Sequence, residues 1–169
     1  MSLADAARDF LEGAGIPPWL VVVALTLAPI LEVRASIPVA MLFYDWGWAV
    51  TFATTFLASL LIIPLAYGIL ILFERLARYS RRLAAILDWL WLRTRRKSLK
   101  AQRAGHAGLF AIVALPLPGA GTWTACLTAY VLGMPAKKAL PTIVLGAIVE
   151  CAILVIVVLF FRGALHYLA

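Results

Sequence analysis

The sequence predicts an all-α integral membrane protein with two inverted repeats, each a re-entrant helical hairpin followed by a transmembrane helix. Hydrophobic residues make up 64% of the 169 residues and charged residues 14%, whereas soluble domains average about 45–50% and about 25%. Two hydrophobic stretches are long enough to cross a bilayer, and two others are interrupted near their middle by proline. The length fits a single membrane domain over residues 1–169.

The first repeat is expected at residues 17–73, as a hairpin over 17–45 and a transmembrane helix over 46–73. The arm from Trp19 to Leu31 is too short to span about 30 Å of hydrocarbon at about 1.5 Å per residue. Residues 46–73 form 28 positions without a charge, which is enough for one tilted crossing.

Residues 74–106 are expected to form a basic amphipathic helix on the membrane surface. They contain ten basic and two acidic side chains, so their net charge is 10 − 2 = +8, and the whole chain carries +7. Such a block between hydrophobic spans is typical of a cytoplasmic loop and of contact with anionic inner-leaflet head groups. This distribution argues against a nucleic-acid partner and makes membrane lipids the expected one.

The second repeat is expected at residues 107–161, as a hairpin over 107–135 and a transmembrane helix over 139–161. An uncharged run of this length would be too long for one straight crossing, and it contains a proline- and glycine-rich break at its middle. Split at the break, the arms 107–115 and 122–133 are each about half a bilayer long.

The charges favour inversion of the second repeat relative to the first. In this arrangement the block 74–106 and the pair Lys137 and Lys138 lie on one side, as the positive-inside rule expects. Broken helices in inverted repeats are typical of secondary transporters. A rival topology makes both hairpins full crossings, giving four spans with both termini inside, and it carries the second break through lipid.

Three charged side chains inside the hydrophobic segments are the expected site for substrate binding or proton coupling. They are Glu32, Arg34 and Glu150. Charges at membrane depth are costly and commonly functional. Burial disfavours a charged carboxylate and a nearby arginine favours it, so either glutamate could exchange a proton. The structural alternative is a Glu32–Arg34 or Arg34–Glu150 pair that only pins the hairpin.

The two hairpin tips are expected to present helix N-termini to the middle of the membrane. Ser36 or Ile37 is expected to cap an arm that starts near Pro38, and Gly121 or Thr122 to cap the other arm. Exposed backbone donors at such ends favour anions. The tip residues are Ser36, Pro38, Pro116, Pro118, Gly119, Gly121, Thr122 and Trp123.

No pattern indicates an enzyme, a cofactor or a metal site. The sequence shows no nucleophile with a base, no metal-ligand spacing and no phosphate-binding loop. Cys126 and Cys151 lie in apolar segments without paired spacing, so we interpret them as small buried residues. A proton gradient is the expected energy source, and a homo-oligomer is compatible with the sequence.

Two motifs resemble a known family. Glu32–Pro38 reads EVRASIP and Leu115–Trp123 reads LPLPGAGTW, which is similar to the putative small multidrug export protein family. That family is in turn similar to the DedA/VTT (SNARE-associated) superfamily. The sequence GMPAKK at Gly133–Lys138 resembles the end of the second motif of that superfamily. One departure is that DedA proteins carry an arginine shortly after the second Pro-Gly, where this chain has Ala120, Gly121 and Thr122.

The resemblance implies paired re-entrant hairpins, a multi-pass plasma-membrane (inner-membrane) location and transport. DedA relatives are linked to proton-driven lipid handling, including flipping of polyprenyl phosphates and phospholipids. The leading hypothesis is therefore a DedA-like, proton-coupled transporter of a phosphate-bearing lipid or small anion. One alternative is a small multidrug exporter of organic cations, with Glu32 and Glu150 as substrate carboxylates. A second is a non-transporting membrane scaffold.

Overall fold

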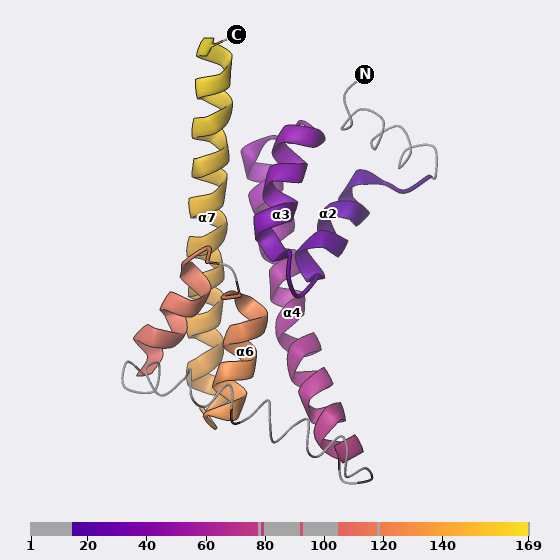
Figure 1. The fold of residues 1–169 in the computed structure, drawn as a ribbon, viewed down its shortest axis with the longest axis vertical. Helices are drawn as coiled ribbons and strands as arrows, with labels where there is room; N and C mark the ends of the chain where they lie inside the picture. The colour runs from indigo at the N-terminus through magenta and orange to yellow at the C-terminus, as the bar shows by residue number, and fades with distance from the viewer. Residues whose placement is uncertain (1–14, 78, 80–91, 93–104, 118, 169) are drawn as a thin grey trace. The chain divides into compact units, whose positions relative to one another are not determined.

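The protein is all-α in the part that the structure, a computed structural model, describes, namely residues 15–77, 79, 92, 105–117 and 119–168. This confirms the prediction that the fold is all-α. Most of the predicted surface helix 74–106 lies outside these residues. The helices are α2 (Pro18–Leu27), α3 (Glu32–Pro38), the π-helix η1 (Val39–Phe43), α4 (Trp48–Ala77), an unlabelled helix Gly105–Ala114, α6 (Thr122–Val131) and α7 (Ala136–Leu168) (Figure 1).

Two helices of the described chain are long and apolar enough to cross a membrane, α4 and α7. They confirm two long apolar helices where the spans were predicted, although α4 has 30 residues and α7 has 33, which is more than predicted. The length of the apolar run determines only how much of the helix can lie in lipid, and not where the helix begins and ends. Backbone hydrogen bonding continues into the polar interface, where Arg75 and Lys137 are tolerated.

The chain divides into two compact units, and each is described by itself. Unit 1 comprises Met1–Ser59 and Val149–Ala169, and unit 2 comprises Leu60–Ile148. Both long helices contribute to both units, because the divisions fall within α4 and α7. The single membrane domain expected over residues 1–169 stays a prediction.

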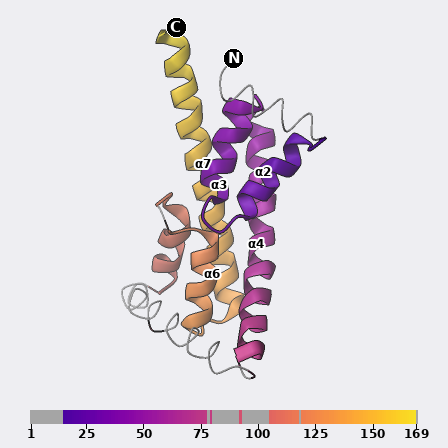
Figure 2. The ribbon, with the colours of Figure 1, turned by 45° about the vertical axis from the view of Figure 1, so that its right-hand side comes forward.

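In unit 1, α2 and α3 pack against each other as a helical hairpin, and the starts of α2 and α4 lie at the same end (Figures 1 and 2). Pro29 explains why α2 ends at Leu27. A residue before proline avoids the helical region, and Ala28 is extended, with φ −68° and ψ 126°. The chain then turns and α3 begins at Glu32.

The predicted start of the second arm near Pro38 is wrong. Ser36 and Ile37 lie inside α3 and cap nothing, and Leu31 is the residue before its first turn. Pro38 instead ends the α-helical register, because it has no N–H to donate four residues back. The helix continues as η1, and the Tyr44 N–H donates to the Val39 carbonyl, 3.1 Å away and five residues back.

The second arm of this hairpin packs along α7. Val33, Ile37 and Met41 form one apolar cluster with residues of α7. The α7 members of the cluster are Cys151, Val155 and Val158. Burial of apolar side chains contributes about 25 cal/mol per Å², so this seam holds the arm to the helix.

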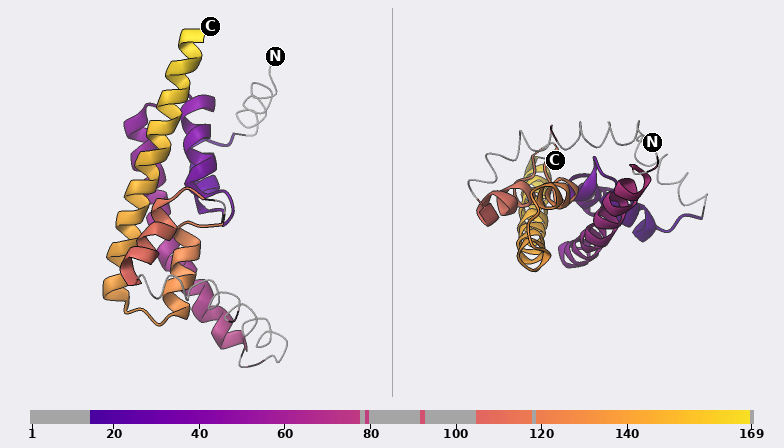
Figure 3. Two further views of the ribbon diagram at one scale, coloured as in Figure 1. Left: turned by 60° about the vertical axis from the view of Figure 1, so that its left-hand side comes forward. Right: turned by 90° about the horizontal axis from the view of Figure 1, so that it is seen from below.

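In unit 2, the helix Gly105–Ala114 and α6 run in opposite directions on either side of the proline–glycine break (Figure 3). Gly121 precedes α6 with φ 135°, a region open to glycine, and it is one of the two residues predicted to cap this arm. Gly133 ends α6 with φ 61°, where the Met134 N–H donates to the Ala129 carbonyl at 2.9 Å. Pro118 lies outside the described residues.

Gly146 lets α7 approach the helix Gly105–Ala114 closely. A Cβ placed at Gly146 would lie 2.6 Å from Cβ of Val113 and 3.3 Å from the Phe110 carbonyl oxygen. Real Cβ atoms do not come this near, so an added methyl group would force the two helices apart.

We predict that Gly146→Ala lowers the midpoint of thermal unfolding in detergent, at a cost of about 1–3 kcal/mol for overpacking. Gly163→Ala is the matched control, because Gly163 lies in the same helix with nothing within 4 Å of its added Cβ. The control should be neutral or stabilising, since alanine favours a helix. Equal midpoints for the two variants would contradict the prediction.

Candidate functional site

The centre of unit 1 is an ion pair between Arg34 of α3 and Glu150 of α7. Nη2 of Arg34 lies 2.9 Å from Oε1 of Glu150, although the residues are 116 positions apart in sequence. The Glu150 side chain is 1% exposed and that of Arg34 is 18% exposed. This is one of the two pairs that the sequence analysis offered as a structural alternative.

Glu32 is buried next to this pair in a strained backbone conformation. It is 3% exposed, and its charge acts on Glu150. Its φ is 47°, in the left-handed region that costs an L-residue roughly 1–2 kcal/mol and that glycine adopts freely. Its N–H donates to the Ala28 carbonyl at 3.1 Å. Such strain at a residue other than glycine makes Glu32 a candidate functional residue.

The three charges of this site do not balance. Glu32, Arg34 and Glu150 are the charged side chains within the hydrophobic stretches 17–44, 46–73, 107–136 and 139–161, and they sum to +1 − 2 = −1. An uncompensated charge in apolar surroundings is expensive. The arrangement therefore suits a proton or a cationic ligand as the partner of the surplus carboxylate. We call Glu32, Arg34 and Glu150 the charged triad.

A pair of buried hydroxyls ties the two arms of the first hairpin together. Oγ1 of Thr26 in α2 lies 2.8 Å from Oγ of Ser36 in α3 and 2.8 Å from the Val22 carbonyl oxygen. Both side chains are fully buried. The sequence analysis singled out Ser36 as a cap but missed Thr26, because only the packing of α2 on α3 brings the two together.

A stripe of hydroxyls on α4 was also missed by the sequence analysis. Thr51, Thr55 and Ser59 are buried and spaced four residues apart, so they share one face of the helix. Each donates to a main-chain carbonyl three or four residues earlier, at 3.1, 2.8 and 2.7 Å. Thr55 also forms a side-chain hydrogen bond with Cys151 of α7. The four-residue spacing was the signal that could have revealed this face.

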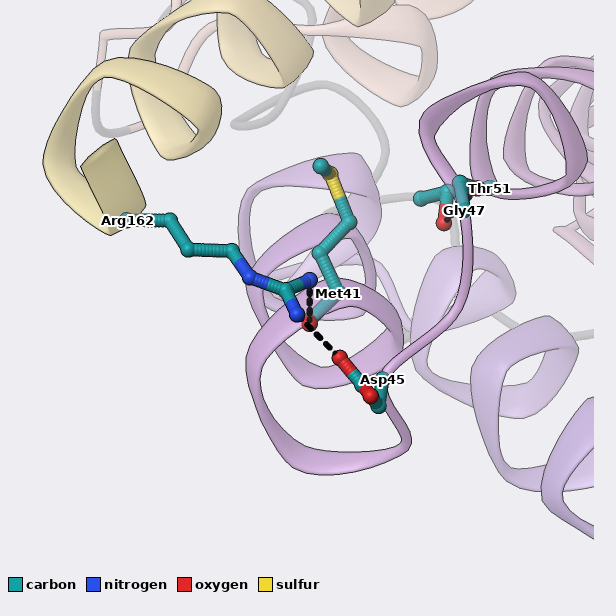
Figure 4. Close-up of polar contacts among 5 residues, drawn as sticks. All are labelled: Met41, Asp45, Gly47, Thr51 and Arg162. Carbon is teal, nitrogen blue, oxygen red and sulfur yellow. Dashed lines mark hydrogen bonds and ion pairs between the residues drawn. The ribbon is translucent and has the colours of Figure 1, made fainter. Parts of the chain in front are cut away.

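A second clamp holds α7 to the end of the same arm (Figure 4). Arg162 donates from Nη1 to the Met41 carbonyl oxygen at 3.3 Å and from Nη2 to the Asp45 carboxylate. Asp45 has φ 56°, a conformation that aspartate tolerates better than most residues. Both side chains are exposed, so the pair itself contributes about 0–1 kcal/mol. The sequence analysis assigned Arg162 no partner.

The predicted tip residues of the second hairpin belong to unit 2. Thr122 is buried at the start of α6, Gly119 is exposed with φ 75°, and Thr124 Oγ1 donates to the Gly119 carbonyl at 3.2 Å. Pro116 precedes the turn, and Trp123 is half-buried in α6. Their predicted role as an anion site at a helix N-terminus stays a prediction.

A family model described as "Putative small multi-drug export protein" matches residues 32–153, which is most of the chain. The chain belongs to this family. The matched region begins at Glu32 and includes Arg34 and Glu150. No curated protein and no solved structure matches the chain. Membership in the small multi-drug export family, with its two apolar helices, makes this a membrane protein. The relationship to DedA proteins stays a resemblance.

We predict that Arg34→Gln destabilises the protein by about 3–5 kcal/mol, because it leaves two buried carboxylates without their cation. The double variant Arg34→Gln/Glu150→Gln should recover part of this loss, since one of those carboxylates is then neutral. Thermal unfolding in detergent measures both. Arg162→Gln is the control and should cost about 1 kcal/mol or less. An Arg34 variant as stable as the Arg162 variant would contradict the prediction.

Proposed function

We propose that this protein is a proton-coupled exporter of small organic cations. The observation that carries the proposal is the surplus negative charge of the charged triad, within a region where charge is costly. An anionic substrate would increase that surplus, whereas a proton or an organic cation would cancel it. The description of the family as small multi-drug export agrees with this reading.

The charge balance of the triad explains why a proton and an organic cation would exchange. A proton on the surplus carboxylate makes the triad neutral, and a monovalent organic cation beside the ionised carboxylate does the same. Both bound together would leave the site with a charge of +1, and neither bound would leave −1. Each of these states is disfavoured in apolar surroundings. Binding of the cation therefore displaces the proton, which is the coupling that an antiporter requires.

The geometry suggests different roles for the two glutamates. Glu150 is engaged by Arg34 at 2.9 Å and so positions the arginine. Glu32 has a strained backbone and lies at the turn between the two arms, where small movements of the hairpin would change its surroundings. We assign proton and cation exchange to Glu32, and positioning to Glu150.

A second candidate function rests on Arg34. Its guanidinium has the forked donors that suit phosphate or carboxylate, which would favour the DedA-like transport of a phosphate-bearing lipid, such as a polyprenyl phosphate, or of a small anion. Glu150 already accepts a hydrogen bond from one of these donors. An anion would have to compete with that carboxylate, so we place this function second. A scaffold without transport activity is the third reading.

We further propose that both helical hairpins are re-entrant and that the repeats are inverted, with the basic block 74–106 on the cytoplasmic side of the plasma membrane. The ten-residue helices α2 and α6 are about 15 Å long, half of a bilayer core. In this arrangement inner-leaflet anionic lipids contact the basic block.

We predict that purified protein in liposomes with an acidic lumen accumulates tetraphenylphosphonium and releases protons in exchange. Glu32→Gln should abolish both fluxes, because it removes the exchanging charge. Glu32→Gly should also abolish both fluxes. Because glycine relieves the strained backbone, this variant should be at least as stable as wild type. Tracer uptake and a lumenal pH dye measure the two fluxes.

Assays in the same liposomes distinguish the exporter from the two other candidate functions, anionic-lipid transport and a scaffold. Flipping of a fluorescent phosphatidic acid that is lost in Arg34→Gln, without cation flux in wild type, would favour the anionic lipid. Absence of both activities in folded wild-type protein would favour the scaffold.

We predict that single cysteines at Ile16 and Gly47 react from one side of the membrane and that cysteines at Ala107 and Ala136 react from the other. All four positions are exposed. The background carries alanine at the buried Cys126 and Cys151. Membrane-impermeant maleimide, applied to sealed vesicles of known orientation, shows on which side of the membrane each cysteine lies. Labelling of Ile16 and Gly47 from opposite sides would show that the first hairpin is a full crossing.

A further inference from the structure

Two tyrosines of unit 2 form an open aromatic corner between α4 and α6. The ring centroids of Tyr67 and Tyr130 lie 6.0 Å apart, and the ring planes meet at 69°. Cys126 lies one turn before Tyr130 in α6, close enough to Tyr67 for the two groups to interact electrostatically. Two residues of α6 at helical spacing therefore face the same tyrosine of α4.

A carboxylate adjoins this corner. Glu74 lies seven residues after Tyr67, two turns along the same face of α4. Its side chain accepts a hydrogen bond from the Tyr130 hydroxyl, which links the acid to the ring. Arg75 is the next residue in α4 and is exposed, but adjacent residues of a helix do not face each other. All three members, Tyr67, Tyr130 and Glu74, are half-buried, so part of each surface is open.

We infer that Tyr67, Tyr130 and Glu74 form a binding site for an organic ammonium or phosphonium cation. A cation is attracted to the face of an aromatic ring within about 6 Å of its centroid. The two rings meet edge to face, with centroids 6.0 Å apart and planes at 69°, so a cation in the angle between the planes can lie near the faces of both rings. The Glu74 carboxylate supplies the opposite charge, and its hydrogen bond with Tyr130 holds both groups in place.

The chemistry of the corner selects among cations. Aromatic faces cannot replace the water shell of a small metal ion, whereas a quaternary or delocalised cation is weakly hydrated and gains from the rings. The site therefore favours lipophilic cations, the substrate class of the proposed function. It lies in unit 2 and uses no residue of the charged triad, so it does not depend on proton exchange by Glu32.

Calorimetric titration of the full-length Glu32→Gln protein with tetraphenylphosphonium chloride tests the site apart from the triad. We expect one binding event that weakens about fivefold or more in Tyr67→Leu, in Tyr130→Leu and in Glu74→Gln. Tyr67→Phe is the matched control and should bind within twofold of its parent, because it keeps the ring. Potassium chloride at the same concentration should give no binding heat.

Two results would overturn the site. One is unchanged affinity in both folded leucine variants, or in Glu74→Gln if a leucine variant fails to fold. The other is the absence of any binding in Glu32→Gln protein with both tyrosines intact. The proposed exporter fails by a different result, namely normal binding at the tyrosines together with no proton-coupled flux in wild-type liposomes.

Discussion

The ion pair between Arg34 and Glu150 is the interaction on which unit 1 depends. It joins residues 116 positions apart, with a side chain on α7 that is only 1% exposed. In such surroundings a charge is tolerated when an opposite charge lies near it. The pair therefore places the second arm of the first hairpin against α7. The apolar seam of Val33, Ile37 and Met41 and the exposed clamp at Arg162 extend that contact along the helix.

The low dielectric around this pair also makes the charge of the third residue, Glu32, important. Glu32 adds a negative charge that Arg34 alone cannot cancel once Glu150 is counted, and it does so from a left-handed backbone conformation. Strain and charge imbalance at one residue are costs that a purely structural position would avoid. The exchange of a proton for an organic cation that we propose would use both. The second site that we propose, formed by Tyr67, Tyr130 and the Glu74 carboxylate, would bind the same class of cation.

Local sequence rules succeeded where one residue decides the backbone and failed where two compete. Gly121 precedes α6 near the expected position, because few other residues adopt φ 135°. The second arm was expected to start near Pro38, although Pro29 makes the turn by forcing Ala28 out of the helix. Pro38 lies where the helix can change to π spacing and continue. Both prolines disrupt a helix, and only the packing of α2 on α3 shows which disruption becomes a turn.

The sequence by itself determined the membrane class, the two long apolar helices, the half-length arms and the identity of the three charged residues in apolar stretches. These depend on length and on hydrophobicity along the chain, which are local properties. Only the tertiary structure decided that Glu150 of α7 lies 2.9 Å from Arg34, that Thr26 meets Ser36, and that Arg162 reaches Asp45. Such partners are chosen by which helix faces pack together, and no spacing along the chain records that choice.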